Sequence, residues 1–94
     1  MSQPYKMPSP SDYYRLPTSD QKIIRTYFEL AKGLNSWFRI QTTIEKWETI
    51  KAEIVDLDFT GEVLLVYVRD ENSIGYELPI SDIKNIDIIE NFYS

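Results

Sequence analysis

The chain of 94 residues contains neither cysteine nor histidine. Zinc sites of the usual kind need these side chains as ligands, and cysteine nucleophiles and histidine-based triads need them as reacting groups. Their absence excludes those chemistries and leaves carboxylates, lysines, tyrosines and hydroxyls. No motif of a known catalytic or metal site is present, so we assign no catalytic residue, no metal ligand and no cofactor and expect a protein that is not an enzyme.

Long apolar stretches are also absent. No run of 18 apolar residues occurs, so the sequence predicts no membrane-spanning helix. The N-terminal segment MSQPYKMPSP lacks the apolar core that a signal peptide requires. The lack of cysteine agrees with this, because small secreted domains are often stapled by disulfides. We therefore expect a cytoplasmic protein.

Glycine is scarce, with three residues, while 43% of the chain is hydrophobic. This composition is typical of a folded domain rather than a disordered segment. A chain of this length forms one domain with a modest core, so its stability is expected to be marginal.

Charge is unevenly distributed around the net value of −5. Residues 1–51 carry eight basic and five acidic side chains, which gives +3, and residues 52–94 carry two basic and ten acidic ones, which gives −8. Carboxylates repel the phosphate backbone of nucleic acids. The acidic C-terminal half therefore weighs against nucleic-acid binding unless the fold hides it from the binding face.

Residues 1–17 are predicted to form an extended arm, because proline disrupts helix interiors and sheet ladders. Three roles are open for it: covering apolar surface of the domain with its tyrosines, remaining a flexible tail, or docking onto a partner. The arm contains Pro4, Pro8, Pro10, Pro17, Tyr5, Tyr13 and Tyr14.

Residues 18–94 are predicted to form a single domain with one helix and five strands. Apolar residues at helical spacing predict a helix over 19–34, and Thr18 and Gln21 have the spacing of a capping box. Alternating apolar and polar residues, rich in β-branched and aromatic types, predict strands. These strands are expected at residues 37–44, 49–59, 62–69, 74–80 and 86–90.

Three features of these strands specify the fold. The apolar period slips by one residue at Ile54-Val55, which predicts a bulge, and the continuous apolar run at 62–69 predicts a central strand buried on both faces. The segment Pro79–Asp82 predicts a one-turn corner capped by Ser81 or Asp82, with Ile83 filling the barrel mouth. We therefore predict an α+β, mostly β domain: an N-terminal helix and a five-stranded antiparallel SH3-like or Sm-like small barrel.

Residues 50–90, through the segments AEIVDLDFTGEVLLV and ELPISDIKNIDI, resemble the C-terminal part of the YolD-like proteins, which are small proteins of Gram-positive bacteria, their plasmids and prophages. That family's pattern has an apolar-x-x-Ile-Asp segment, a strand, and then apolar-x-x-Asp-Ile-x-x-Ile. The resemblance implies a helix followed by a small barrel. It is carried by Ile54, Val55 and Asp56 and by Ile80, Asp82, Ile83 and Ile86, whereas the family's N-terminal Arg-Gly and Trp pattern is absent here.

The first functional hypothesis is a protein-interaction and regulatory module, an accessory protein of a phage or mobile element that acts on a host or plasmid-encoded protein. Its contacts are expected at Trp47, in a predicted hairpin loop, at Tyr13 and Tyr14 of the arm, and at exposed barrel edges. Exposed tryptophan and tyrosine are common binding hot spots. For Trp47, packing against the helix or arm and stacking on nucleic-acid bases are the alternatives.

A second hypothesis is an Sm-like protein that binds RNA or single-stranded DNA. Arg39, Lys46 and Lys51, with Arg25 and Lys32, would then position phosphates. A third is an acidic inhibitor of a DNA-binding enzyme. A barrel edge can also pair between subunits and form a homo-oligomer. Asp56 and Asp58 share a strand face, but two such acids are usually solvated, so we predict no metal there.

Overall fold

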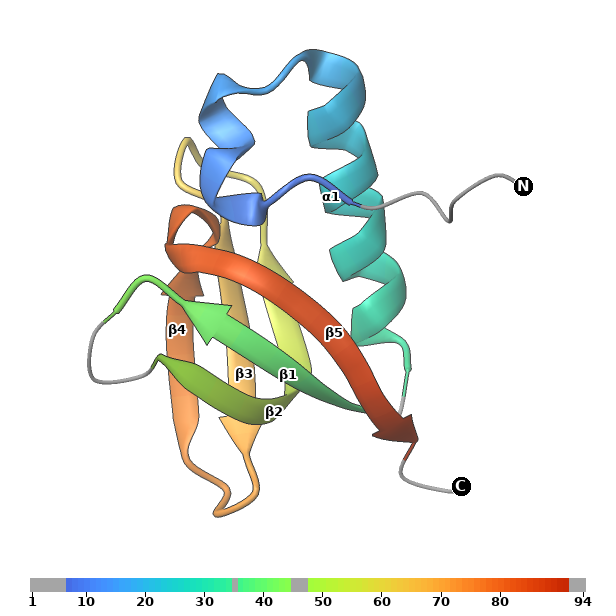
Figure 1. The fold of residues 1–94 in the computed structure, drawn as a ribbon, viewed down its shortest axis with the longest axis vertical. Helices are drawn as coiled ribbons and strands as arrows, with labels where there is room; N and C mark the ends of the chain where they lie inside the picture. The colour runs from blue at the N-terminus through green and yellow to red at the C-terminus, as the bar shows by residue number, and fades with distance from the viewer. Residues whose placement is uncertain (1–6, 35, 45–47, 92–94) are drawn as a thin grey trace.

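The computed structural model describes residues 7–34, 36–44 and 48–91. One α-helix is followed by a five-stranded antiparallel sheet in the order β4-β3-β2-β1-β5, which confirms the predicted α+β, mostly β fold (Figure 1). Along the described chain, none of the helices combines the length and apolar character that a membrane span requires. The elements are η1 (Pro10–Arg15), α1 (Thr18–Lys32), β1 (Ser36–Thr42), β2 (Thr49–Asp58), β3 (Leu65–Asp70), β4 (Gly75–Pro79), η3 (Ile80–Asp82) and β5 (Ile83–Asn91).

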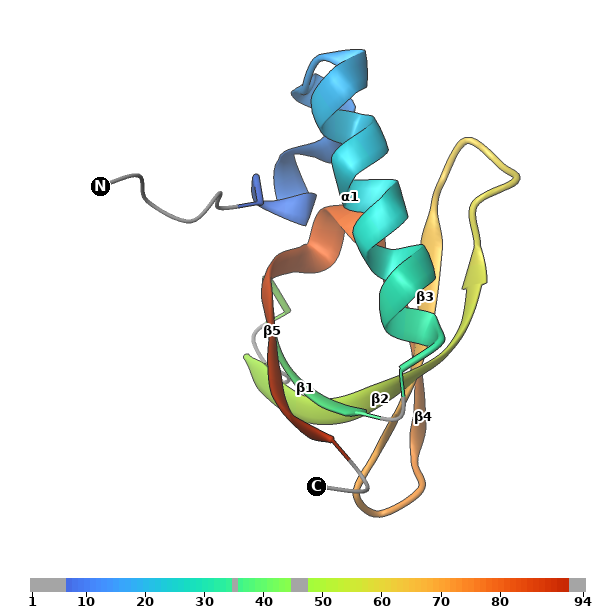
Figure 2. The same cartoon turned by 90° about the vertical axis from the view of Figure 1, so that its right-hand side faces the viewer.

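The sheet curls strongly, as a small barrel requires. The register of β2 against β3 shifts between Ile54 and Asp56, which confirms the bulge predicted from the slip in the apolar period. Figure 2 shows β5 on one side of the curled sheet, β3 and β4 on the other, and α1 over the opening. The fifth strand returns to pair with β1, so the first and last strands of the sequence are neighbours.

The corner between β4 and β5 is the predicted single helical turn. The strand ends at Pro79, the turn occupies Ile80–Asp82, and Ile83 is completely buried at the start of β5. The predicted side-chain cap is wrong, because no side chain caps this turn. Asp82 instead ties the corner to the end of β1: its carbonyl accepts the N–H of Thr43 at 2.8 Å, and its carboxylate accepts the Thr43 hydroxyl at 3.3 Å.

The prediction that residues 62–69 form the central strand is wrong. The centre of the sheet is β2, and β3 lies one place from the edge. Side chains of β3 alternate, with Val66 and Val68 buried and Leu65 and Tyr67 partly exposed. A continuous apolar run can therefore form a strand with only one buried face, provided that the large side chains on its outer face are partly exposed to solvent.

Helix α1 places Ile24, Phe28 and Ala31 in the core. The ring of Phe28 meets that of Phe59 edge-on, with centroids 6.3 Å apart. The predicted capping box does not form, since no side chain caps the helix and the amide of Gln21 donates to the carbonyl of Tyr13 at 2.9 Å. Core packing and a bond to the preceding segment therefore position this helix.

Within the described part of the arm, Pro10–Arg15 form a 3-10 helix flanked by extended residues, which corrects the prediction of an extended arm over residues 1–17. Pro10 opens the 3-10 helix η1, a first-turn position that its fixed φ suits. Tyr13 is buried in the core, and its ring packs edge-on against Tyr14. This segment packs against η3, β5 and α1, so it belongs to the domain rather than preceding it.

Candidate functional site

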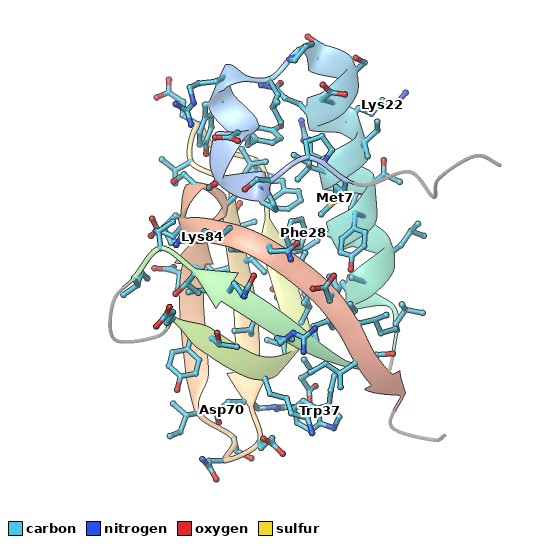
Figure 3. The ribbon with its side chains drawn as sticks, viewed as in Figure 1. Met7, Lys22, Phe28, Trp37, Asp70 and Lys84 are labelled. Atoms are coloured by element: carbon cyan, nitrogen blue, oxygen red, sulfur yellow. The ribbon has the colours of Figure 1, made fainter. Side chains whose placement is uncertain are left out.

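A groove of about 610 Å³ runs between helix α1 and strand β5. One wall comes from the helix, the other from the strand, and Met7 lies at the groove beside the helix (Figure 3). Ile23 and Tyr27 stand one helical turn apart, so the helix presents them along a single line. The described lining residues are Met7, Ile23, Tyr27, Asn85, Ile86, Asp87 and Ile88.

Four consecutive residues of β5, Asn85–Ile88, line this groove. Successive side chains of a strand point to opposite faces of the sheet. A groove that touches all four must therefore run along the edge of the strand, where the backbone is accessible, and not over one face. Since β5 is the last strand of the sheet, no other strand of the described chain pairs with this edge.

The side chains around the groove are largely apolar and partly open to solvent. Ile88 pairs in register with buried Phe38, yet half of it (50%) is exposed because the groove lies over it. Ile23 is 37% exposed on the facing helix. Apolar side chains continue along the same side of the helix, through the half-buried Tyr27 to the exposed Leu30, and the exposed Leu34 follows just after the helix ends at Lys32. Helix α1 therefore carries a second apolar stripe beside the stripe that faces the core.

Asp87 is the one charged residue among the described residues that line the groove. Its carboxylate accepts the amide of Asn85 at 3.2 Å and lies 3.9 Å from the guanidinium of Arg39, with about half of its side chain exposed. Burial raises the pKa of the Tyr27 phenol, and the negative charge of Asp87 raises it further. The negative charge of Asp87 therefore acts on the helical wall as well as on Arg39.

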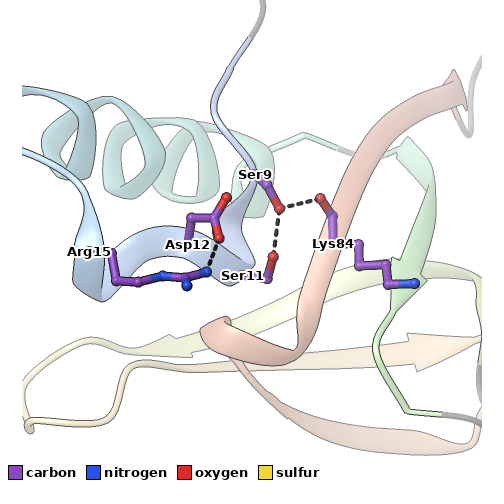
Figure 4. A network of polar contacts seen from close by, with 5 residues as sticks. All are labelled: Ser9, Ser11, Asp12, Arg15 and Lys84. Atoms are coloured by element: carbon purple, nitrogen blue, oxygen red, sulfur yellow. Dashed lines mark hydrogen bonds and ion pairs between the residues drawn. The ribbon is translucent and has the colours of Figure 1, made fainter.

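The two edges of the sheet differ in their access to a partner strand. On one side, β4 is five residues long and ends in Pro79, and a short strand with proline is poorly suited to pairing. On the other, β5 spans Ile83–Asn91, with register shifts on either side of its regular segment Asn85–Ile88. The hydroxyl of Ser9 donates to the carbonyl of Lys84 at 2.7 Å, just before that segment (Figure 4). The accessible edge is therefore a short regular stretch beginning at Asn85.

The predicted contact residues of the arm and the hairpin loop have three different outcomes. Tyr13 is 5% exposed, so its prediction as a partner contact is wrong: its ring fills the core. Tyr14 is 47% exposed, and its hydroxyl accepts the N–H of Leu64 at 2.9 Å. Trp47 and Lys46 lie outside the described residues.

Among the described cations that were predicted to position phosphates, Arg39, Lys51 and Lys32 lie beside carboxylates. Arg39 is 3.9 Å from Asp87, and the ammonium of Lys51 is 3.5 Å from Glu71 and 5.7 Å from the ring of Trp37. The other two described members of the set, Lys32 and Arg25, lie together beside Phe59. Lys32 pairs with Asp56 at 3.2 Å, while Arg25 donates to the Phe59 carbonyl at 3.5 Å and lies over its ring. Among the described residues, these cations do not form one surface that is free of acids.

The carboxylates of Asp56 and Asp58 bind different partners. The Leu57 N–H, and then Lys32, lower the pKa of Asp56. The hydroxyl and N–H of Thr60 lower the pKa of Asp58. Across the described residues there is no group of three or more side chains arranged to hold a metal ion.

No family model, curated protein or solved structure matches the chain. Function has to be inferred from the groove, which the sequence interpretation missed. Its signal was present: Ile23, Tyr27, Leu30 and Leu34 follow a helical spacing of their own, offset from the core positions. A helix with one core face needs no second stripe, so this offset is the sequence feature that points to a further contact.

Proposed function

We propose that the protein is a non-enzymatic protein-interaction module whose binding site is the groove between α1 and β5. The observation that carries the proposal is the run of four β5 residues along the groove, which makes the strand's edge part of its wall. Exposed Ile23 and Ile88 supply apolar contact area on either side. Apolar anchors beside accessible backbone groups are the elements from which peptide and protein sites are commonly built.

Charge supports a protein partner rather than a nucleic acid. The chain carries −5 overall, and Asp87 is the one charged group among the described residues that line the groove. A phosphate backbone would meet repulsion there. The predicted phosphate contacts Arg39 and Lys51 each lie within 4 Å of an acid, so a nucleic acid would have to displace those ion pairs.

The proposal is tested by site-specific photo-cross-linking in the native host. A photoreactive phenylalanine derivative is placed at Ile88 in the groove or at Ile74, which lies in the β3–β4 turn. These two isoleucines are 50% and 52% exposed, so they form a matched pair that differs in location. We expect a protein cross-link from position 88 that is absent or much weaker from position 74.

A further variant confirms that the groove itself is responsible. Ile23→Ser, on the facing wall, is expected to reduce the cross-link from position 88, because it removes an apolar contact without touching the strand. Equal cross-linking from positions 74 and 88, or cross-linking from 88 to nucleic acid alone, would contradict the proposal.

A further inference from the structure

We infer that the groove binds an extended peptide segment of its partner, which pairs with β5 as a sixth strand and carries a lysine or arginine opposite Asp87. This inference rests on the proposed function and specifies the ligand of that site. It is carried by the strand edge at Asn85–Ile88, by the helical wall opposite, and by the charge of Asp87.

The backbone of β5 provides the pairing groups. In any strand, alternate residues direct their N–H and C=O groups to opposite sides. The described chain satisfies one side of β5 by pairing with β1. The other side borders the groove, and at Lys84 a carbonyl already accepts a bond from the side chain of Ser9. Main-chain hydrogen bonds to such an edge are the basis of β-strand addition.

The two faces of β5 set the side-chain pattern of the ligand. Ile86 and Ile88 lie on the inner face, in register with Ile40 and Phe38, whereas Asp87 lies on the outer face in register with Arg39. An added strand continues the same alternation. Its inner residues would be apolar and pack beside Ile88 and Ile23, and its outer residue beside Asp87 would be basic.

The shape of the site favours a peptide segment over a second folded copy. Helix α1 forms the wall opposite the strand edge, so an incoming strand lies between two elements and not on an open flank. An antiparallel pair of β5 strands centred on Asp87 would also place two carboxylates opposite each other, which is destabilising. A basic apolar segment meets neither obstacle.

The probe is a capped peptide of about nine residues, long enough to span the regular part of β5 at roughly 3.3 Å per residue. It has valine at alternate positions, threonine between them, and lysine at the centre on the threonine side. Matched peptides carry glutamate at the centre, or backbone N-methyl groups on either the valine or the threonine amides. Binding is followed by chemical-shift changes of the ¹⁵N-labelled protein at 25 °C.

Strand pairing predicts an asymmetric effect of methylation. One alternate set of peptide amides faces β5 and the other faces away, so one methylated peptide loses at least about tenfold in affinity and the other binds nearly unchanged. Shifts are expected at the amides of Asn85–Ile89. The inference would be overturned if the two methylated peptides had the same affinity or if the chemical-shift changes lay away from β5. It would also be overturned if none of the peptides bound.

Charge recognition is tested with variants of the protein. The lysine peptide should bind about threefold more tightly than the glutamate peptide, and Asp87→Asn should abolish that preference. Glu77→Gln on the opposite edge strand is the matched control and should preserve it. A preference that persists in Asp87→Asn would overturn the charge assignment. Failure of these peptide tests leaves the cross-linking result to decide the proposed function separately.

Discussion

Replacing Ile83 by alanine tests the corner that closes the fold. Ile83 follows the one-turn helix η3, begins β5, and is completely buried, in register with the buried Thr42 of β1. The substitution removes apolar volume where the chain turns from one edge strand to the other. The backbone hydrogen bonds of the strand can remain, so the effect isolates packing.

The expected loss of stability follows from the deleted carbon atoms. Isoleucine to alanine removes three methyl or methylene groups, each contributing about 0.8 kcal/mol when buried, or roughly 2.4 kcal/mol in total. A residual cavity adds to this, and buried Ile→Ala substitutions cost about 2–5 kcal/mol. We predict about 3 kcal/mol, which is a large part of the roughly 5–14 kcal/mol expected for a domain of this length.

Urea unfolding followed by circular dichroism at pH 7 measures the free energy of unfolding for this variant. Ile83→Val is expected to lose about 0.5–1.5 kcal/mol, because it removes one methylene. Ile74→Ala provides the exposed control: 52% of this side chain is in solvent, so a loss within about 0.5 kcal/mol is expected.

The graded order Ile83→Ala, Ile83→Val, Ile74→Ala is the signature of a packed corner. If Ile83→Ala lost no more than Ile74→Ala, with an unchanged denaturant slope, Ile83 would not be a core residue. Packing of Ile83 would then not be what holds the turn from β4 into β5.

Three further predictions concern local structure. Tyr14→Phe removes the acceptor for the N–H of Leu64, so the free energy of unfolding measured in urea should fall by about 1 kcal/mol. An unchanged urea midpoint would show that this hydrogen bond does not contribute to stability. Ser73 has φ 64°, so Ser73→Gly should relieve backbone strain and leave the protein equally stable or up to about 1 kcal/mol more stable; a clear loss would show that the serine suits this turn. Hydrogen bonds to Asp70, first from the N–H of Ile74, lower its pKa in the folded state, so its stabilising contribution is present above the unfolded pKa of about 3.9 and is lost as the pH falls through the folded value. Urea titrations from pH 7 to pH 3 should therefore show that the free energy of unfolding falls less steeply with acid for Asp70→Asn than for the unsubstituted chain. Parallel curves would show that these hydrogen bonds to Asp70 do not stabilise the turn.

Local patterns were sufficient to predict the fold class. The slip in apolar period at Ile54 and Val55 reflects the alternation of a strand, so it located the bulge. The interruption at Pro79 similarly located the corner, because proline ends strand pairing. The sheet order was harder to predict, since the apolar run at 62–69 has the composition of a central strand and yet keeps one face partly in water.

The candidate site could not be predicted from local patterns. The groove joins Ile23 on the helix to Ile88 on the last strand, and only the three-dimensional path of the chain brings them together. Tyr13 illustrates the reverse case. It lies in a proline-rich segment whose composition is typical of an exposed arm, but tertiary packing buries its side chain. Helical spacing can identify a spare apolar stripe, but it cannot identify the element that the stripe faces.

Hydrogen exchange in the presence of the lysine-centred peptide distinguishes strand addition at β5 from binding elsewhere, because the two edges of the sheet can be compared in one experiment. When the peptide is bound, we expect slower exchange at alternate amides of Asn85–Ile89 in β5 and no change in β4 at Gly75–Pro79. Slower exchange at β4, or none at β5 under saturating peptide, would contradict strand addition at β5.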